Sequence, residues 1–114
     1  MLIRGNIDHV FVTEIDSRRG PVTLTSVWLV DRHDHVPVTK QPPTMYEVQF
    51  LNDKTHDWAH AITTRFEDGD RVLAIVRDDL EVATSTDADG RPRIYIKARG
   101  IDLALSALDA ARTD

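Results

Sequence analysis

Residues 52–69 of this 114-residue chain, NDKTHDWAHAITTRFEDG, decide its fold, because they interrupt an otherwise β-rich pattern. Trp58, Ile62 and Phe66 recur every four residues, which places them along one apolar stripe of a helix. Elsewhere Val, Ile and Thr are frequent, and the apolar residues alternate or form short runs, as they do in strands. The sequence therefore predicts one interior helix set among strands.

The ends of this helix are predicted from its capping residues. Thr55 is the expected N-cap, because its hydroxyl can accept a hydrogen bond from a free N–H of the first turn. Asp57 favours the positive start of the helix dipole. Gly69 suits the C-terminal cap, where a left-handed backbone is common. Together these residues place the helix between the third and fourth strands.

Three strands are predicted before the helix, at residues 3–13, 22–30 and 46–51. A Gly-Pro turn separates the first two, and a long loop with three prolines, at residues 31–44, separates the second from the third. Residues 22–30 carry apolar side chains on both faces, which is typical of a strand inside a barrel or beneath another subunit.

Two strands are predicted after the helix, at residues 71–85 and 93–105, joined by a Gly-containing turn as a long hairpin. In the last strand most apolar residues occupy even positions up to Ala98 and odd positions from Ile101 on. This change of face at Arg99-Gly100 is the pattern of a β-bulge. Three strands, a helix and two further strands are the order of an OB-fold barrel. We therefore predict a mainly β protein, a five-stranded OB-fold barrel with one α-helix between strands 3 and 4 and a long hairpin between strands 4 and 5.

Composition excludes several classes of protein. The absence of Cys excludes a disulfide framework and a thiol nucleophile, and is compatible with a reducing compartment. No apolar run is long enough for a membrane span, and the N-terminus lacks the pattern of a secretory signal. The 19 acidic residues exceed the 14 Lys and Arg, so the net charge of −5 argues at first against a nucleic-acid partner.

Four segments, taken in order, carry a resemblance to a known family. They are residues 2–7 (LIRGNI), 59–72 (AHAITTRFEDGDRV), 80–93 (LEVATSTDADGRPR) and 101–106 (IDLALS). They resemble the opening strand, the helix with its Gly-x-Arg-Val entry into the fourth strand, the long hairpin and the final strand of the bacterial single-stranded DNA-binding protein family. The resemblance implies an OB-fold DNA-binding domain at residues 1–108, followed by a short tail at 109–114.

The resemblance also implies a function. Proteins of this family bind single-stranded DNA without sequence preference, typically as homotetramers, and protect it in DNA replication, repair and recombination. The expected location is the cytoplasm, on the nucleoid. No membrane, cofactor or metal is expected to take part.

The resemblance implies that bases stack on aromatic side chains. Val27 and Leu29 align with inward positions of the second strand, so Trp28 points outward and is the best stacking candidate, with a subunit-interface or core Trp as the alternative. Tyr46 matches an aromatic position at the start of the third strand. If Val48 and Phe50 face inward, however, Tyr46 does so too and cannot contact DNA.

Phosphate contacts are expected from basic residues on the strands and the hairpin, because Arg pairs well with phosphate and stacks on bases. The hairpin pair Arg91 and Arg93 is the strongest. Arg4, Arg77 and Lys97 complete the predicted site, and Arg18, Arg19 and Arg99 also lie on strands or hairpins that the resemblance places near DNA.

Several positions depart from the family pattern. The second aromatic position of the third strand falls at Leu51 or Asn52, the hairpin aromatic falls at Ser85, and Asp78-Asp79 replaces small or basic residues. These departures and the acidic charge support an alternative, an OB-fold protein-interaction module, namely a family paralogue with reduced DNA affinity.

Two further features of the sequence bear on function. His56 and His60 have a spacing that can hold a metal, and His33-Asp34-His35 could supply a third ligand, but solvated histidines are the default for such a pair. No nucleophile–base motif or phosphate-binding Gly-rich loop occurs, so we expect no enzyme.

The C-terminus and the distribution of charge bear on the expected partners. The family usually continues into a disordered tail with an acidic end that recruits other proteins, whereas this chain stops at Asp114, so such recruitment is not supported or the chain is truncated. The acidic residues gather at predicted turns and ends, and several arginines lie on strands. A negative net charge is therefore compatible with a local basic groove.

Overall fold

The computed structural model describes residues 1–33 and 42–106. The predicted tail at 109–114 and most of the predicted loop at 31–44 lie outside these residues. The elements are β1 (Leu2–Ser17), β2 (Gly20–Asp31), β3 (Thr44–Leu51), α1 (Trp58–Arg65), β4 (Arg71–Val76), β5 (Glu81–Thr86) and β6 (Pro92–Leu105).

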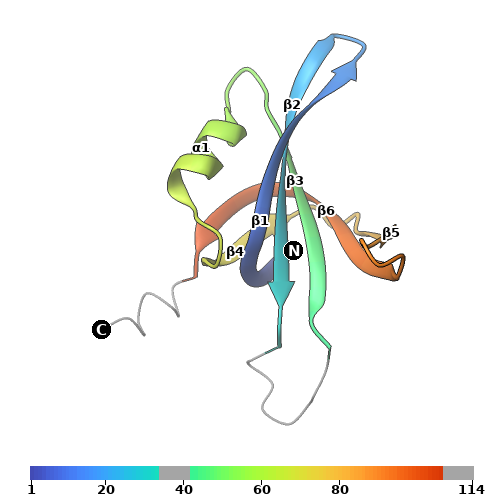
Figure 1. Ribbon diagram of the computed structural model, residues 1–114. Coiled ribbons are helices and arrows are strands. Elements are labelled where there is room, and N and C mark those ends of the chain that lie inside the picture. Colours follow the sequence, from blue (N-terminus) through green and yellow to red (C-terminus); the bar gives the residue numbers. More distant parts are fainter. Residues whose placement is uncertain (34–41, 107–114) are drawn as a thin grey trace.

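Five strands close into a barrel in the ring order β1, β2, β3, β6 and β4 (Figure 1). Neighbouring strands are antiparallel except β3 and β6, which are parallel. In the chain α1 lies between β3 and β4, and β5 extends the sheet as a hairpin with β6. The predicted OB-fold barrel, with its helix between the third and fourth barrel strands and its hairpin, is confirmed.

The core forms from alternate residues of the strands, as the period of two requires. Val27, Leu29, Val48 and Phe50 are fully buried, whereas Trp28, between the first two, lies on the opposite face of β2. Ile62 closes one end of the barrel from α1. The apolar stripe predicted for the helix therefore faces the core.

The helix begins later than Thr55. The Asp57 side chain is the N-cap and accepts a hydrogen bond from the backbone N–H of His60 at 3.1 Å. Thr55 instead donates its N–H and its hydroxyl to Asp53 Oδ1, each at 2.7 Å, so its hydroxyl is engaged in the preceding turn. The prediction of Thr55 as N-cap was wrong because Asp53 competes for its hydroxyl.

The helix also ends before Gly69, because Phe66 is the C-cap with an extended backbone. Gly69 has a positive φ of 93° in the following turn and donates its N–H to Ile7 O at 2.7 Å. Gly69 therefore fastens the turn to β1 rather than capping the helix.

The strand predicted at residues 71–85 is divided into β4 and β5. Asp78 and Asp79 form the break, and Leu80 N–H donates to Asp78 O at 3.0 Å in a tight turn. Asp is disfavoured in strands, and both carboxylates here are exposed. The pair Asp78-Asp79 indicates a break in the strand, but a single strand was predicted across it.

The predicted bulge in the last strand is confirmed. Ile75 on β4 pairs with Asp102, but Val76 pairs with Gly100, so Ile101 is an extra residue in β6. Gly100 is required here, because a Cβ at this position would lie 2.3 Å from Phe50 Cε1. The bulge lets β6 bend around the barrel core.

Candidate nucleic-acid interface

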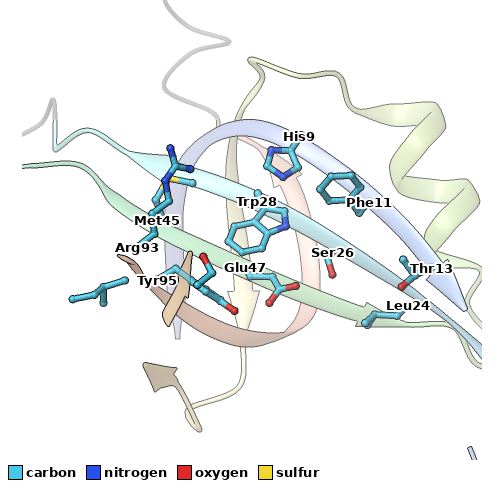
Figure 2. Close-up of a pocket in the computed structure, with 12 residues that line it drawn as sticks. His9, Phe11, Thr13, Leu24, Ser26, Trp28, Met45, Glu47, Arg93 and Tyr95 are labelled. Atoms are coloured by element: carbon cyan, nitrogen blue, oxygen red, sulfur yellow. The ribbon is translucent and has the colours of Figure 1, made fainter. Parts of the chain in front are cut away.

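Four rings form a continuous row on the outer face of the barrel, which we call the aromatic row (Figure 2). Phe11 and His9 lie on β1, with ring centroids 4.7 Å apart and an edge-to-face geometry. His9 stacks on Trp28 of β2 at 5.7 Å, and Trp28 meets Tyr95 of β6 at 4.9 Å with a 58° tilt. Rings in such contact offer a surface on which planar bases can stack.

A second bulge positions the β1 rings. Ile7 pairs with Leu29 but His9 pairs with Trp28, so Asp8 is an extra residue in β1. Ile7 is buried in the core, and regular alternation would turn His9 inward as well. The extra residue reverses this alternation and places His9 and Phe11 on the outer face.

The row borders a hollow of about 440 Å³, which we call the aromatic groove (Figure 2). Two polar side chains lie at its base, Ser26 at 7% and Glu47 at 9% exposure. Glu47 is the cross-strand partner of Trp28 on one side and of Lys97 on the other. The other residues that line the groove are His9, Phe11, Thr13, Leu24, Met45, Ser85, Arg93, Ile94 and Tyr95.

Cations continue the surface from the groove, and we call Arg77, Arg93, Lys97 and Arg99 the basic stripe. The three residues of β6 share the parity of Tyr95 and therefore its outer face. Arg77 directly follows β4, where its backbone N–H donates to Arg99 O at 2.9 Å, and both residues line a second hollow.

Two members of the basic stripe have acidic partners. Arg77 lies 4.0 Å from Asp79, and Arg93 lies 3.9 Å from Asp87, with both guanidinium groups exposed. Among the described residues, the side chains of Lys97 and Arg99 form no ion pair or hydrogen bond. These two cations are therefore available to phosphate groups.

The structure brings together four of the seven residues predicted for DNA contact. Trp28 and Arg93 line the aromatic groove, and Arg77 and Lys97 lie in the basic stripe. Arg91 is exposed at the turn of the β5–β6 hairpin, where its backbone N–H donates to Asp87 Oδ1 at 2.8 Å. Arg4 lies beside β4, paired with Leu73, and does not line the groove.

Tyr46 faces the interior of the barrel, as its alternation with Val48 and Phe50 predicts, and it lies apart from the aromatic row. Its ring packs against the core, on the same face of β3 as the fully buried Val48 and Phe50. Burial of the phenol, and secondarily the charge of Asp31, raise the pKa of Tyr46. The outward positions of β3 hold Met45 and Glu47, neither of which is aromatic.

Three aromatic-row residues, His9, Phe11 and Tyr95, were not predicted from the sequence. Ile94, Ile96 and Ala98 share one parity in the sequence, and Tyr95 lies between them with Arg93 and Lys97 on the other, which was the available signal for its outer face. His9 and Phe11 carried no such signal, because the bulge that turns them outward was not predicted.

The histidine pair with metal-ligand spacing, His56 and His60, lies beside and on α1. His56 stacks on Trp58 at 5.1 Å, with an interplanar angle of 11°. His60 is exposed on α1, and Asp34 and His35 lie outside the described residues. Within residues 1–33 and 42–106, no three His, Asp or Glu side chains gather as metal ligands, and α1 is not long and apolar enough to cross a membrane.

The chain matches no protein-family model and no curated protein sequence. It is similar in structure to the small single-stranded DNA-binding protein from Streptomyces coelicolor, with a TM-score of 0.58 and 18% identity over 96% of this chain and 94% of that one. It is also similar to a mitochondrial single-stranded DNA binding protein from S. cerevisiae, with a TM-score of 0.49 and 17% identity over 92% and 91% of the two chains. The first likeness, over nearly the whole of both chains, agrees with the strand order in assigning the OB fold.

Proposed function

We propose that the protein binds single-stranded DNA along the aromatic row and the basic stripe. The observation that carries this proposal is the continuity of the two on one outer face, from Phe11 on β1 to Arg99 on β6. Non-specific single-strand binding needs stacking platforms beside a cationic path for the backbone. The similarity to single-stranded DNA-binding proteins supports the same function.

Each part of the surface has a role in this proposal. Phe11 is 57% exposed and offers the most open ring, while Trp28 and Tyr95 hold bases at the groove. The four members of the basic stripe bind phosphates, Lys97 and Arg99 without an acidic partner among the described residues, and Arg91 lies beyond them at the hairpin turn. Because rings and phosphate contacts accept any base, most of the bound strand is bound without regard to sequence.

The proposed biological role is the coating and protection of unpaired DNA during replication, repair or recombination, in the cytoplasm on the nucleoid. This role requires binding without catalysis. It follows the expectation from the resemblance and is supported by the aromatic row.

We propose further that the chain forms a homo-oligomer, with the homotetramer as the expected state. Leu2 and Ile75 are neighbours on β1 and β4, and both are exposed, at 66% and 41%. Exposed apolar neighbours on a sheet are typical of an interface. Light scattering should give about four times the 12.9 kDa mass of the chain, and a Leu2→Ser/Ile75→Ser variant should give a smaller mass.

The DNA-binding proposal is tested by titrating oligo-dT at low salt. Loss of one stacked base costs about 1–3 kcal/mol, so Trp28→Ala should weaken binding about 5- to 150-fold. Trp58→Phe is the matched control, because the Trp58 ring packs on Phe50 and His56 rather than in the aromatic row. The absence of binding at about 20 mM salt, where phosphate contacts are strongest, would refute the proposal.

The second candidate is an OB-fold module that binds another protein. Val82 and Ile94, on the β5–β6 hairpin, are 71% and 70% exposed, which favours this function. If the chain is such a module, the unmodified chain should form a complex with a protein partner and should not bind oligo-dT. The Val82→Ser/Ile94→Ser variant should lose that complex.

A further inference from the structure

Glu47 is a largely buried acidic residue in the groove where the proposed function places a DNA base. The residue is 9% exposed and lies on the outer face of β3 between Trp28 and Lys97. Within the described part of the chain it forms no hydrogen bond or ion pair. Its carboxylate oxygens still meet solvent, because among the described residues Thr25 Oγ1 is the one fully enclosed side-chain polar atom without a partner. The unpartnered oxygens point into the aromatic groove (Figure 2).

The ligand that suits these oxygens must bring hydrogen-bond donors. A carboxylate has two acceptor oxygens and no donor. A phosphate of the DNA backbone is repelled by its negative charge, so the backbone cannot occupy this position. A base can, because one of the two rings, Trp28 or Tyr95, can stack against its face while its edge reaches the bottom of the groove.

The donor pattern of the base edge decides which base fits. The Watson–Crick edge of guanine presents two adjacent donors, N1–H and the N2 amino group, which match the two oxygens of one carboxylate. Cytosine and adenine place a ring acceptor beside their amino group, and thymine flanks its N3–H with two carbonyls. We infer that Glu47 makes the aromatic groove select guanine at one position of the bound strand.

This inference rests on the proposed DNA binding and adds base selection to it. Elsewhere along the strand the contacts are rings and phosphates, so the preference concerns a single nucleotide. Ser26, beside Glu47 at the base of the groove, adds a hydroxyl that can donate or accept.

The test compares two strands of about 12 nucleotides, within the site size of an OB fold, by fluorescence anisotropy. One is oligo-dT, and the other carries one central dG, which cannot form a quadruplex within the strand. The dG strand should bind about tenfold tighter, since a bidentate base contact gives about 1–3 kcal/mol of discrimination. Deoxyinosine, which lacks the N2 amino group, should lose most of this gain.

Two variants assign the preference to Glu47. Glu47→Gln keeps the size of the side chain but replaces one acceptor with an amide donor, so the dG preference should fall to about twofold or less. Glu81→Gln removes the same charge from an exposed position on β5 outside the aromatic groove. It should retain the preference and controls for the general effect of one fewer negative charge. Thermal melting confirms that each variant is folded.

The possible results separate the two proposals. A dG preference that disappears in Glu47→Gln but persists in Glu81→Gln supports the inference. Oligo-dT binding without any dG preference overturns it and leaves the proposed function intact, as does a preference that Glu47→Gln retains. If neither strand binds, both proposals fail. The comparison of dG with deoxyinosine on the unmodified chain tests the donor match even if Glu47→Gln does not fold.

Discussion

Neutralising Lys97 and Arg99 should halve the dependence of DNA binding on salt. Both side chains lie in the basic stripe and have no acidic partner among the described residues, so Gln at these positions leaves no carboxylate newly unpaired. The double variant Lys97→Gln/Arg99→Gln therefore removes two phosphate contacts without breaking an ion pair.

The magnitude follows from the number of cations in the stripe. Each phosphate that is neutralised contributes about −0.7 to the slope of log affinity against log salt for a single strand. If all four members contact phosphates, the slope is about −2.8, and it falls to about −1.4 in the double variant. From about 50 to 200 mM salt, the affinity should then fall about 50-fold for the unmodified chain but about 7-fold for the variant.

Oligo-dT titrations at four or more salt concentrations measure these slopes. The control is Lys54→Gln/Arg65→Gln, which removes equal charge from exposed positions before and at the end of α1. A slope that stays the same in the stripe variant, or that changes equally in the control, would show that general electrostatic attraction, rather than the stripe, holds the phosphates.

Three other predictions concern the barrel and its face. Gly100→Ala should lower stability by about 1–3 kcal/mol, because its Cβ would lie 2.3 Å from the Phe50 ring, and an unchanged melting temperature would contradict this contact. Hydrogen bonds from the His60 N–H and the Asn52 amide lower the pKa of Asp57, so the carboxylate stabilises the fold above its unfolded pKa and loses that effect as pH falls below about 4. The advantage of the unmodified chain over Asp57→Asn in urea unfolding should therefore shrink below about pH 4. Tyr46→Phe should leave oligo-dT affinity within about twofold, since the ring faces the core, and a loss comparable to that of Trp28→Ala would place it on the DNA face.

The element order was predictable because its signals are local. The spacing of Trp58, Ile62 and Phe66 is complete within three turns, and the alternation of Val48 and Phe50 is complete within one strand. Such a local pattern depends only on one face of the helix or strand being buried, whatever packs against that face. The OB-fold order of strands and helix therefore followed from the sequence.

The aromatic row was less predictable, because it depends on irregular pairing. Parity counting assumes a regular strand, and one extra residue at Asp8 reverses the face of every side chain that follows. The N-cap was misassigned for a related reason. Thr55 and Asp57 both suit a cap, and the choice was decided by the contacts of Thr55 with Asp53 and of Asp57 with Asn52.

The acidic net charge and the proposed base selection act on different terms of the binding free energy. Phosphate contacts are common to every strand, so they set the affinity and its salt dependence but cancel in the ratio between two sequences. The contact of Glu47 with a base edge is present for one strand and absent for the other, so it survives in that ratio. In a chain of net charge −5 the phosphate contacts contribute less binding free energy than they do in a basic protein. The difference in affinity between a dG strand and a dT strand is unaffected by this loss. The dG to dT ratio should therefore stay constant across the salt range in which both affinities fall.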